Sequence, residues 1–298
     1  MRPIANTTDP PDAVPVTGGI AADLEASACR GEYEPISFAV YALRDVEDLT
    51  LEISDLQGSG TIDSGAVDPS LLKFWYRSGL YSGDPNGRWL LKELLLKDDG
   101  LVRVDTERQH NYLRHSPEAG TEEYVLCSGS DSDHLAGVRP RDADTHQPVR
   151  VDRNTTKTFW LTVQVPEDAR AGIYHGSVTL RWKSEGGVDE RKIPLRLTVH
   201  PFELPRSPLI HSVFNRSRLS PNPDPDINSE YISEERYERE IRNQVAHGIL
   251  HPNSYDGYRV LRPALEIRRR AGVATDRFFC VDLSYHVGLA TKKGEEFR

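Results

Sequence analysis

The stretch Phe159-Trp160-Leu161-Thr162-Val163-Gln164-Val165 carries a large apolar side chain at every second position from 159 onward. A period of two is typical of a β-strand with one face in a core, because successive side chains point to opposite faces. Four further runs follow the same rule, at residues 36–40, 49–53, 178–182 and 193–199. Turn-forming residues separate the runs, as at 166–169 and 185–187. Several short strands joined by turns predict an antiparallel β-sandwich.

The pattern changes after Pro208 to an alternation of strands and helices. Ser233 is a good N-cap for a helix whose apolar residues recur at helical spacing, and Gly248 is a good helix end. A second helix is predicted over 258–271, closed by Gly272. Short apolar runs flank the two helices and predict three parallel strands, at 209–214, 249–253 and 278–283.

These patterns predict two domains and a fold class. Residues 1–206 are expected to form the antiparallel β-sandwich, with a less regular region at 75–150 and an exposed loop at 128–148. Residues 207–298 are expected to form the first three βα units of a truncated barrel, because a complete (β/α)8 barrel needs roughly 250 residues. The predicted fold class is thus a β-sandwich followed by an incomplete α/β (β/α)8-type barrel.

Composition excludes several classes of function. The formal net charge of the 298 residues is −9, which argues against a nucleic-acid partner, because such proteins concentrate Lys and Arg on one surface. No run approaches the roughly 20 apolar residues that cross a bilayer, so no membrane partner is expected. The first residues have no signal-peptide pattern, and the localisation stays open. The three cysteines, Cys29, Cys127 and Cys280, are too far apart to indicate a zinc site or a disulfide framework.

No recognised catalytic or cofactor motif occurs in the chain. A phosphate-binding loop, a His-Glu-x-x-His helix and a Gly-x-Ser-x-Gly elbow are all missing, so no catalytic residue and no cofactor are predicted. Residues 224–235 place oxygen-bearing side chains at several positions of a Ca²⁺ loop, but Ser229 stands where that loop needs glycine. An acidic loop before a helix is the simpler interpretation, and no metal is predicted.

Polar and aromatic residues follow each of the three strands predicted after Pro208. In a (β/α) barrel such positions meet at one face, and amides, phenols, carboxylates and guanidinium groups suit a sugar. The candidate substrate-binding residues are Asn215, Arg216, Asn253, Tyr255, Asp256, Asp282, Tyr285 and His286. For each of them the alternative is an ordinary loop residue, and Asp256 could instead be the N-cap of the second helix.

Several phrases of the sequence resemble the N-terminal half of glycoside hydrolase family 123 proteins, including relatives that carry a domain of unknown function 4091. The phrases are residues 30–35, 93–99, 162–166, 171–176, 199–205 and 247–249. The resemblance implies a β-sandwich before a barrel that hydrolyses glycosidic bonds. In the family, an adjacent Asp-Glu pair on a middle barrel strand works with the acetamido group of the substrate. The part of this chain predicted to form the barrel contains no such pair. The dipeptide occurs only at Asp189-Glu190, within the predicted sandwich.

The sequence therefore predicts a fragment of a glycoside hydrolase, an accessory domain plus part of the catalytic barrel, that binds carbohydrate and is inactive alone. Whether the chain is itself an enzyme stays open. The alternatives are a non-catalytic carbohydrate-binding module and a structural or assembly module that associates with itself through open barrel edges. The sugar, its linkage and the stereochemical outcome are not encoded in any motif of this chain.

Overall fold

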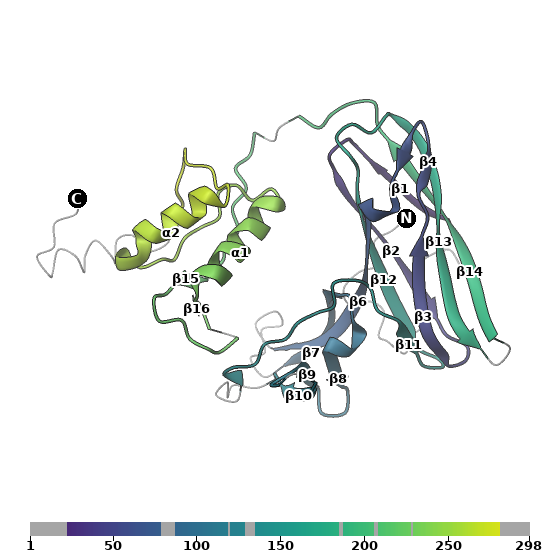
Figure 1. Ribbon diagram of the computed structural model, residues 1–298, viewed down its shortest axis with the longest axis horizontal. Coiled ribbons are helices and arrows are strands. Elements are labelled where there is room, and N and C mark those ends of the chain that lie inside the picture. Colours follow the sequence, from purple (N-terminus) through teal and green to yellow (C-terminus); the bar gives the residue numbers. More distant parts are fainter. Residues whose placement is uncertain are drawn as a thin grey trace, which may run out of the picture. The chain divides into compact units, whose positions relative to one another are not determined.

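The computed structural model describes residues 23–78, 87–118, 120–128, 135–184, 187–205, 208–227 and 229–280. The chain divides into two compact units. Unit 1 consists of Met1–Ser130 and Arg139–Pro205, and unit 2 of Asp131–Val138 and Arg206–Arg298. Figure 1 shows unit 1 as strands and unit 2 as the part that holds the two α-helices.

A four-stranded antiparallel sheet forms one layer of unit 1. Its strands lie in the order β2 (Tyr33–Tyr41), β12 (Thr156–Gln164), β6 (Val67–Ser78) and β7 (Arg88–Leu96). β12 is the strand predicted from the alternation at 159–165, and it pairs with β2 and β6 over most of its length.

A seven-stranded sheet supplies the second set of strands in unit 1. Its main path is β1 (Leu24–Ala28), β14 (Gly187–Val199), β13 (Gly172–Ser184), β3 (Val46–Ile53) and β11 (Val149–Val151). β4 (Leu56–Gly58) pairs with β13 and with β5 (Thr61–Ile62). β1 runs parallel to β14, whereas the other pairings are antiparallel.

One hydrophobic core joins the two sheets. Phe159, Leu161 and Val163 of β12 are 0% exposed, and they belong to the same buried cluster as Val178 of β13 and Leu197 of β14. Each such side chain stabilises the fold by about 1.5–3 kcal/mol through its removal from water. The period of two in the sequence therefore reports faithfully which side chains lie inside.

A third, smaller sheet lies in the region that the sequence predicts to be irregular. It is antiparallel, in the order β10 (Glu123–Leu126), β9 (His110–His115) and β8 (Val102–Asp105). Its own small core contains Leu96, Leu101 and Val102. Short 3₁₀ turns at Ser64–Ala66 and Asp99–Leu101 precede β6 and β8.

Asp98 and Asp99, at the end of segment 93–99, belong to a cluster of charged residues. Lys73 and Lys157 both donate to the carboxylate of Asp99, at 2.6 and 2.7 Å. Burial alone raises the pKa of Asp99, but the two lysines outweigh burial and hold the pKa below its ordinary value. Asp98 accepts from Gly100 N and from Arg114. These residues stabilise a turn rather than form a reactive site.

Unit 2 contains β15 (Arg218–Leu219), β16 (Tyr231–Ile232), α1 (Glu234–Ala246) and α2 (Tyr258–Arg270). Ser233 caps α1 by accepting from Arg236 N, as predicted. The backbone N–H of Gly248 donates to Val245 O just past α1, with a φ of 79° that glycine adopts without strain. Among the described residues, no helix is long and apolar enough to cross a membrane.

The predicted fold class, a β-sandwich followed by an incomplete (β/α)8-type barrel, is wrong. Strand dominates the described residues, which contain two α-helices, no (β/α)8 barrel and instead a curled, half-barrel-like β-sheet. Residues 209–214 and 249–253 form no strand, and of 278–283 only 278–280 are described, with a single bridge from Cys280 to Ser254.

The reason lies in the backbone pairing of these segments. Asn253 N donates to Val213 O at 3.4 Å, and Ser254 N donates to Phe279 O at 2.8 Å. Neighbouring segments thus share isolated hydrogen bonds instead of the continuous ladder that defines a parallel strand. Large apolar side chains also stay exposed, such as Leu209 at 71%. An apolar run alone therefore does not make a strand.

Candidate functional site

Asn215 and Asn253 tie together the first two polar segments of unit 2. The backbone N–H of Asn215 donates to Asn253 Oδ1 at 2.7 Å, and Asn253 Nδ2 donates back to the carbonyl of Asn215 at 3.4 Å. Asn253 is only 6% exposed, because its amide replaces the backbone partner that a strand would supply. This pair therefore fixes the backbone on which the neighbouring side chains are displayed.

An aromatic cluster surrounds Arg218 in the same unit. The short parallel pair of β15 and β16 places Arg218 opposite Tyr231, whose ring centroid lies 5.8 Å from the guanidinium carbon. Tyr255 lies at 5.6 Å on the same guanidinium and meets Phe214 edge to face at 5.1 Å. We call Phe214, Arg218, Tyr231 and Tyr255 the aromatic cluster.

The aromatic cluster presents rings to solvent and charges beside them. Phe214 is 71% and Tyr231 50% exposed. Glu230 forms an ion pair with Arg216 at 2.7 Å and lies 3.7 Å from Nε of Arg218, a nitrogen that is buried without a hydrogen-bond partner in the described structure. Flat apolar faces next to a guanidinium and a carboxylate suit a sugar, which exposes both C–H faces and hydroxyl groups.

Asp256 lies inside unit 2 and not on its surface, with 2% exposure. Its Oδ1 accepts from Leu219 N at 2.8 Å, and its Oδ2 accepts from Tyr237 at 2.6 Å and from Ser254 at 2.7 Å. The N-cap of α2 is Gly257, so Asp256 does not cap that helix. The carboxylate instead connects β15, α1 and the segment before α2.

Tyr237 and Arg268 extend this buried network. Arg268 is 3% exposed and donates to the hydroxyl of Tyr237 at 3.2 Å, to Asn253 O at 3.3 Å and to Pro252 O. Burial, reinforced by Asp256, raises the pKa of Tyr237 above its ordinary value, although Arg268 opposes the shift. The phenol therefore stays protonated at neutral pH and serves as a donor to Asp256.

An open hollow of about 420 Å³ lies along α1. Its lining residues are Asn215, Arg236, Arg239, Glu240, Asn243 and Gln244. The volume falls within the roughly 300–1,000 Å³ usual for ligand pockets, although the lining is more polar than most. Asn215 belongs to this hollow and stands in sequence between Phe214, a member of the aromatic cluster, and Arg216, which pairs with Glu230.

The predicted candidate residues fall into three groups in the structure. Asn215 and Asn253 are in direct contact, Tyr255 belongs to the aromatic cluster, and Arg216 pairs with Glu230 beside it. Asp256 lies in the buried network. The other candidates, Asp282, Tyr285 and His286, lie outside the described residues. Whether any of these residues binds substrate stays a prediction.

Phe214 and Tyr231 were not among the predicted residues. Phe214 was assigned to a buried strand, and Tyr231 lies between a polar loop and a helix. The pairing of Arg218 with Tyr231 depends on two strands of two residues each, separated by 11 residues of loop. Strand pairs this short leave no periodic signal in the sequence. The only signal that could have indicated the aromatic cluster is the grouping of Phe214, Arg216 and Arg218.

Metal binding finds no geometric support in the described part of the chain, where no three His, Cys, Asp or Glu side chains gather as a metal would require. In the loop that resembles a Ca²⁺ site, Asp224 accepts instead from the backbone N–H of Asp226 at 2.9 Å.

Residues 117–182 match the family model of the glycoside hydrolase 123 N-terminal domain. The match begins before β10 and ends within β13, so it falls in the strand-rich part of the chain. It confirms the resemblance predicted from the short phrases, and over these residues the chain is similar to that domain. No curated protein matches the chain.

Solved structures add distant likenesses. A family 123 glycoside hydrolase from Clostridium perfringens, studied for glycolipid glycan hydrolysis, shares 15% identity over 61% of this chain and 23% of its own, with a TM-score of 0.36. The adhesin CfaE of enterotoxigenic E. coli shares 13% sequence identity, over 63% of this chain and 48% of the adhesin, with a TM-score of 0.24. The CooA pilin subunit of enterotoxigenic E. coli shares 14% sequence identity, over 59% of this chain and 90% of the pilin, with a TM-score of 0.19.

With TM-scores this low, none of these likenesses carries an argument about fold or function. The chain spans less than a quarter of the length of the family 123 hydrolase.

Proposed function

We propose that this chain is the carbohydrate-binding portion of a glycoside hydrolase and does not turn over substrate by itself. The observation that carries the proposal is the aromatic cluster, in which exposed rings stand beside an arginine and a carboxylate. The similarity of residues 117–182 to the family 123 N-terminal domain supports a carbohydrate as the ligand.

The chemistry of the aromatic cluster fits a sugar ring. The exposed faces of Phe214 and Tyr231 offer apolar area to the C–H groups of a pyranose. Arg216 and Glu230 lie next to those rings and supply donors and acceptors for the hydroxyl groups. Asn253 and Asp256 hold the backbone behind the rings, so the surface is formed before the ligand arrives.

The environment of the carboxylates supports the proposed lack of turnover. A glycosidase needs a paired acid and nucleophile or base that flank the scissile bond. Three carboxylates of this part of unit 2 are already engaged: Glu230 pairs with Arg216, Glu240 accepts from Arg236, and Asp256 accepts from backbone and hydroxyl donors. Asp189 and Glu190 lie on β14 of unit 1, where they pair with Arg44 and Arg181.

The binding proposal is tested with two ring deletions and a matched control. Titration calorimetry with a panel of oligosaccharides should identify a ligand. Tyr231→Ala or Tyr255→Ala should lower the affinity for that ligand about tenfold. Tyr33→Ala removes a tyrosine that is 55% exposed on β2 in unit 1, and it should leave affinity unchanged. Equal affinity in all three variants would place the sugar elsewhere.

The catalytic half of the proposal is tested separately. Aryl glycosides, including those of 2-acetamido sugars, should release no phenol above the uncatalysed rate when mixed with the full chain. Hydrolysis that survives repurification and rises in proportion to protein concentration would contradict the proposal.

A second candidate function, assembly with another copy of the chain, is favoured by exposed apolar residues in segment 208–214. Leu209, Ile210 and Val213 are 71, 36 and 40% exposed. Exposed apolar residues in a row are typical of association surfaces. Sedimentation equilibrium of the wild-type chain and of Leu209→Ser tests this, and a monomer at all concentrations would rule the candidate out.

A further inference from the structure

The hollow along α1 is built from one face of that helix. Arg236, Arg239, Glu240, Asn243 and Gln244 follow the spacing of three and four residues that places side chains along one stripe. Tyr237 and Ile241 lie on the adjacent, buried face and fix the helix against the rest of unit 2. The stripe is therefore held rigidly toward solvent, with Asn215 at its border.

Most of the charge in the hollow is already matched. Arg236 donates to Glu240 Oε1 at 2.9 Å, and the other oxygen of Glu240 accepts from the hydroxyl of Ser217. Arg236 also reaches the carbonyl of Ile227 at 3.4 Å. These contacts use both oxygens of Glu240, so the carboxylate is not left to neutralise another cation.

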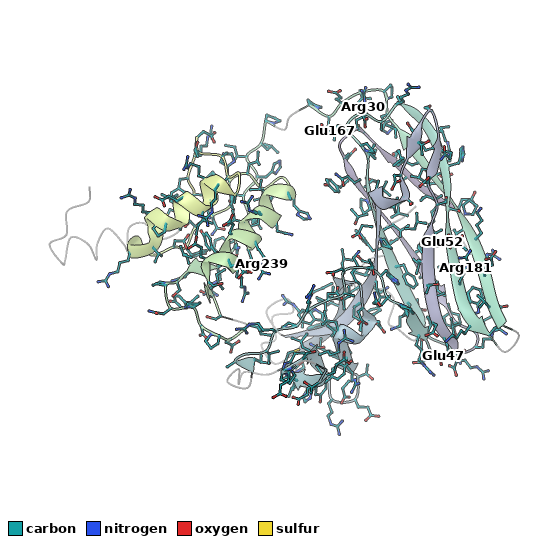
Figure 2. All side chains as sticks on the ribbon, in the orientation of Figure 1. Arg30, Glu47, Glu52, Glu167, Arg181 and Arg239 are labelled. Atoms are coloured by element: carbon teal, nitrogen blue, oxygen red, sulfur yellow. The ribbon has the colours of Figure 1, made fainter. Side chains whose placement is uncertain are left out.

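Arg239 is the group left over. It is exposed, and within the described ranges it has no ion pair and no hydrogen bond through its side chain; Glu235, four residues earlier, does not pair with it. Figure 2 labels this side chain on α1. The lining thus carries one unmatched positive charge, two arginines against one glutamate, on a chain whose net charge is −9.

We propose that the hollow binds the anionic group of an acidic sugar, a carboxylate or a sulfate, with Arg239 as its partner. This inference rests on the proposed carbohydrate-binding function and adds the class of ligand. A guanidinium offers a planar fork of donors that matches such an oxyanion. The amides of Asn215 and Asn243 line the same hollow and are suited to the hydroxyl groups of the ring.

The most direct test compares an oligogalacturonate with its methyl ester, which keeps the shape and removes the charge. Calorimetry should find that the acid binds the wild-type chain about tenfold more tightly than the ester. Arg239→Gln should abolish that difference without weakening the ester. Arg259→Gln, which removes an exposed arginine from α2, is the matched control and should retain the difference.

Salt and a sulfated probe complete the experiment. Raising the ionic strength from about 0.05 to 0.5 M should weaken binding of the acid and leave binding of the ester unchanged, because the Debye length shortens severalfold. A sulfated galactan oligosaccharide is the third ligand: if it shows the Arg239 dependence and the galacturonate does not, the anion is a sulfate.

The possible failures separate the two proposals. The acidic-sugar inference is overturned, and the carbohydrate-binding proposal left standing, if no charge preference depends on Arg239. That result requires acid and ester to bind with equal affinity, or with a preference that survives in Arg239→Gln, and the sulfated galactan to bind the wild-type chain and Arg239→Gln equally. Failure of all three ligands and of the neutral panel would overturn both. An unchanged circular dichroism unfolding midpoint in Arg239→Gln confirms that the variant is folded.

Discussion

Asp256→Asn is the substitution whose effect the structure predicts most specifically. The carboxylate is 2% exposed and accepts three hydrogen bonds, two at Oδ2 and one at Oδ1. Asparagine keeps the shape and offers only one acceptor oxygen. If that oxygen faces Tyr237 and Ser254, the new NH₂ group faces the backbone N–H of Leu219. If it is turned the other way, the two hydroxyl protons lose their acceptor.

Either orientation leaves at least one buried donor unpaired. An unpaired buried donor costs about 1–3 kcal/mol. Removing the buried charge recovers part of its desolvation cost, while the remaining bonds become neutral and weaker. We therefore expect the free energy of unfolding of unit 2 to fall by about 2 kcal/mol.

The two units can be followed by different signals in one denaturation experiment. All four tryptophans, Trp75, Trp89, Trp160 and Trp182, lie in unit 1, whereas the α-helices of the described residues lie in unit 2. Asp256→Asn should lower the urea midpoint seen by far-ultraviolet circular dichroism and leave the midpoint of tryptophan fluorescence in place. Each unit has its own buried cluster, which permits this separation.

A matched control comes from α2. Glu266 has a side chain that is 60% exposed and pairs with Arg262 at 3.5 Å, so Glu266→Gln should cost under about 0.5 kcal/mol. The reasoning is refuted if Asp256→Asn unfolds at the wild-type midpoint of the dichroism signal, since the carboxylate would then not be the anchor that its contacts indicate.

Three further predictions concern stability and domain structure. Phe159→Ala should lower the free energy of unfolding by about 3–5 kcal/mol in the tryptophan fluorescence signal, because the ring is fully buried in unit 1; a shift confined to the dichroism signal would contradict this placement. The raised pKa of Tyr237 predicts stability that is complete below about pH 10 and declines above it, because the unfolded phenol ionises first. Tyr237→Phe should show a smaller alkaline decline, and an identical decline would show that this tyrosine is not responsible. Limited proteolysis should cut near residues 206–208 and release a folded fragment of residues 1–206, since the core of unit 1 lies within it; early cuts inside 159–199 would show that this fragment is not an independent unit.

The strands that pack into the main core of unit 1 were predictable from the sequence, because each has one face in that core. The alternation of Phe159, Leu161 and Val163 is a direct consequence of that burial. The two helices were accessible for a similar local reason, since Ser233 and Gly248 mark the ends of α1 by their own chemistry. The third sheet, β10-β9-β8, has its own small core and lies where the sequence predicts an irregular region.

The barrel prediction was wrong because an apolar run does not determine by itself which other segments pair with it. Residues 209–214 have the composition of a buried strand, yet Leu209 and Phe214 are each 71% exposed. Whether such a run becomes a strand depends on neighbours that pair with both of its edges, which is a property of the tertiary structure.

The candidate site was predicted in part, for residues close together in sequence. Asn215, Arg216 and Tyr255 were singled out by their position after apolar runs, and the structure places them in or beside the hollow and the aromatic cluster. The burial of Asp256 and the approach of Tyr231 to Arg218 depend on contacts across the fold, so no spacing in the sequence announces them.

Backbone amide chemical shifts, recorded while an oligosaccharide ligand is added, test the central claim most directly. The account predicts perturbations at residues 214–218, 230–231 and 253–255, with those at 239–244 appearing only for an acidic sugar. Perturbations confined to the strands of unit 1, or none for any ligand of the panel, would contradict the claim that the aromatic cluster binds carbohydrate.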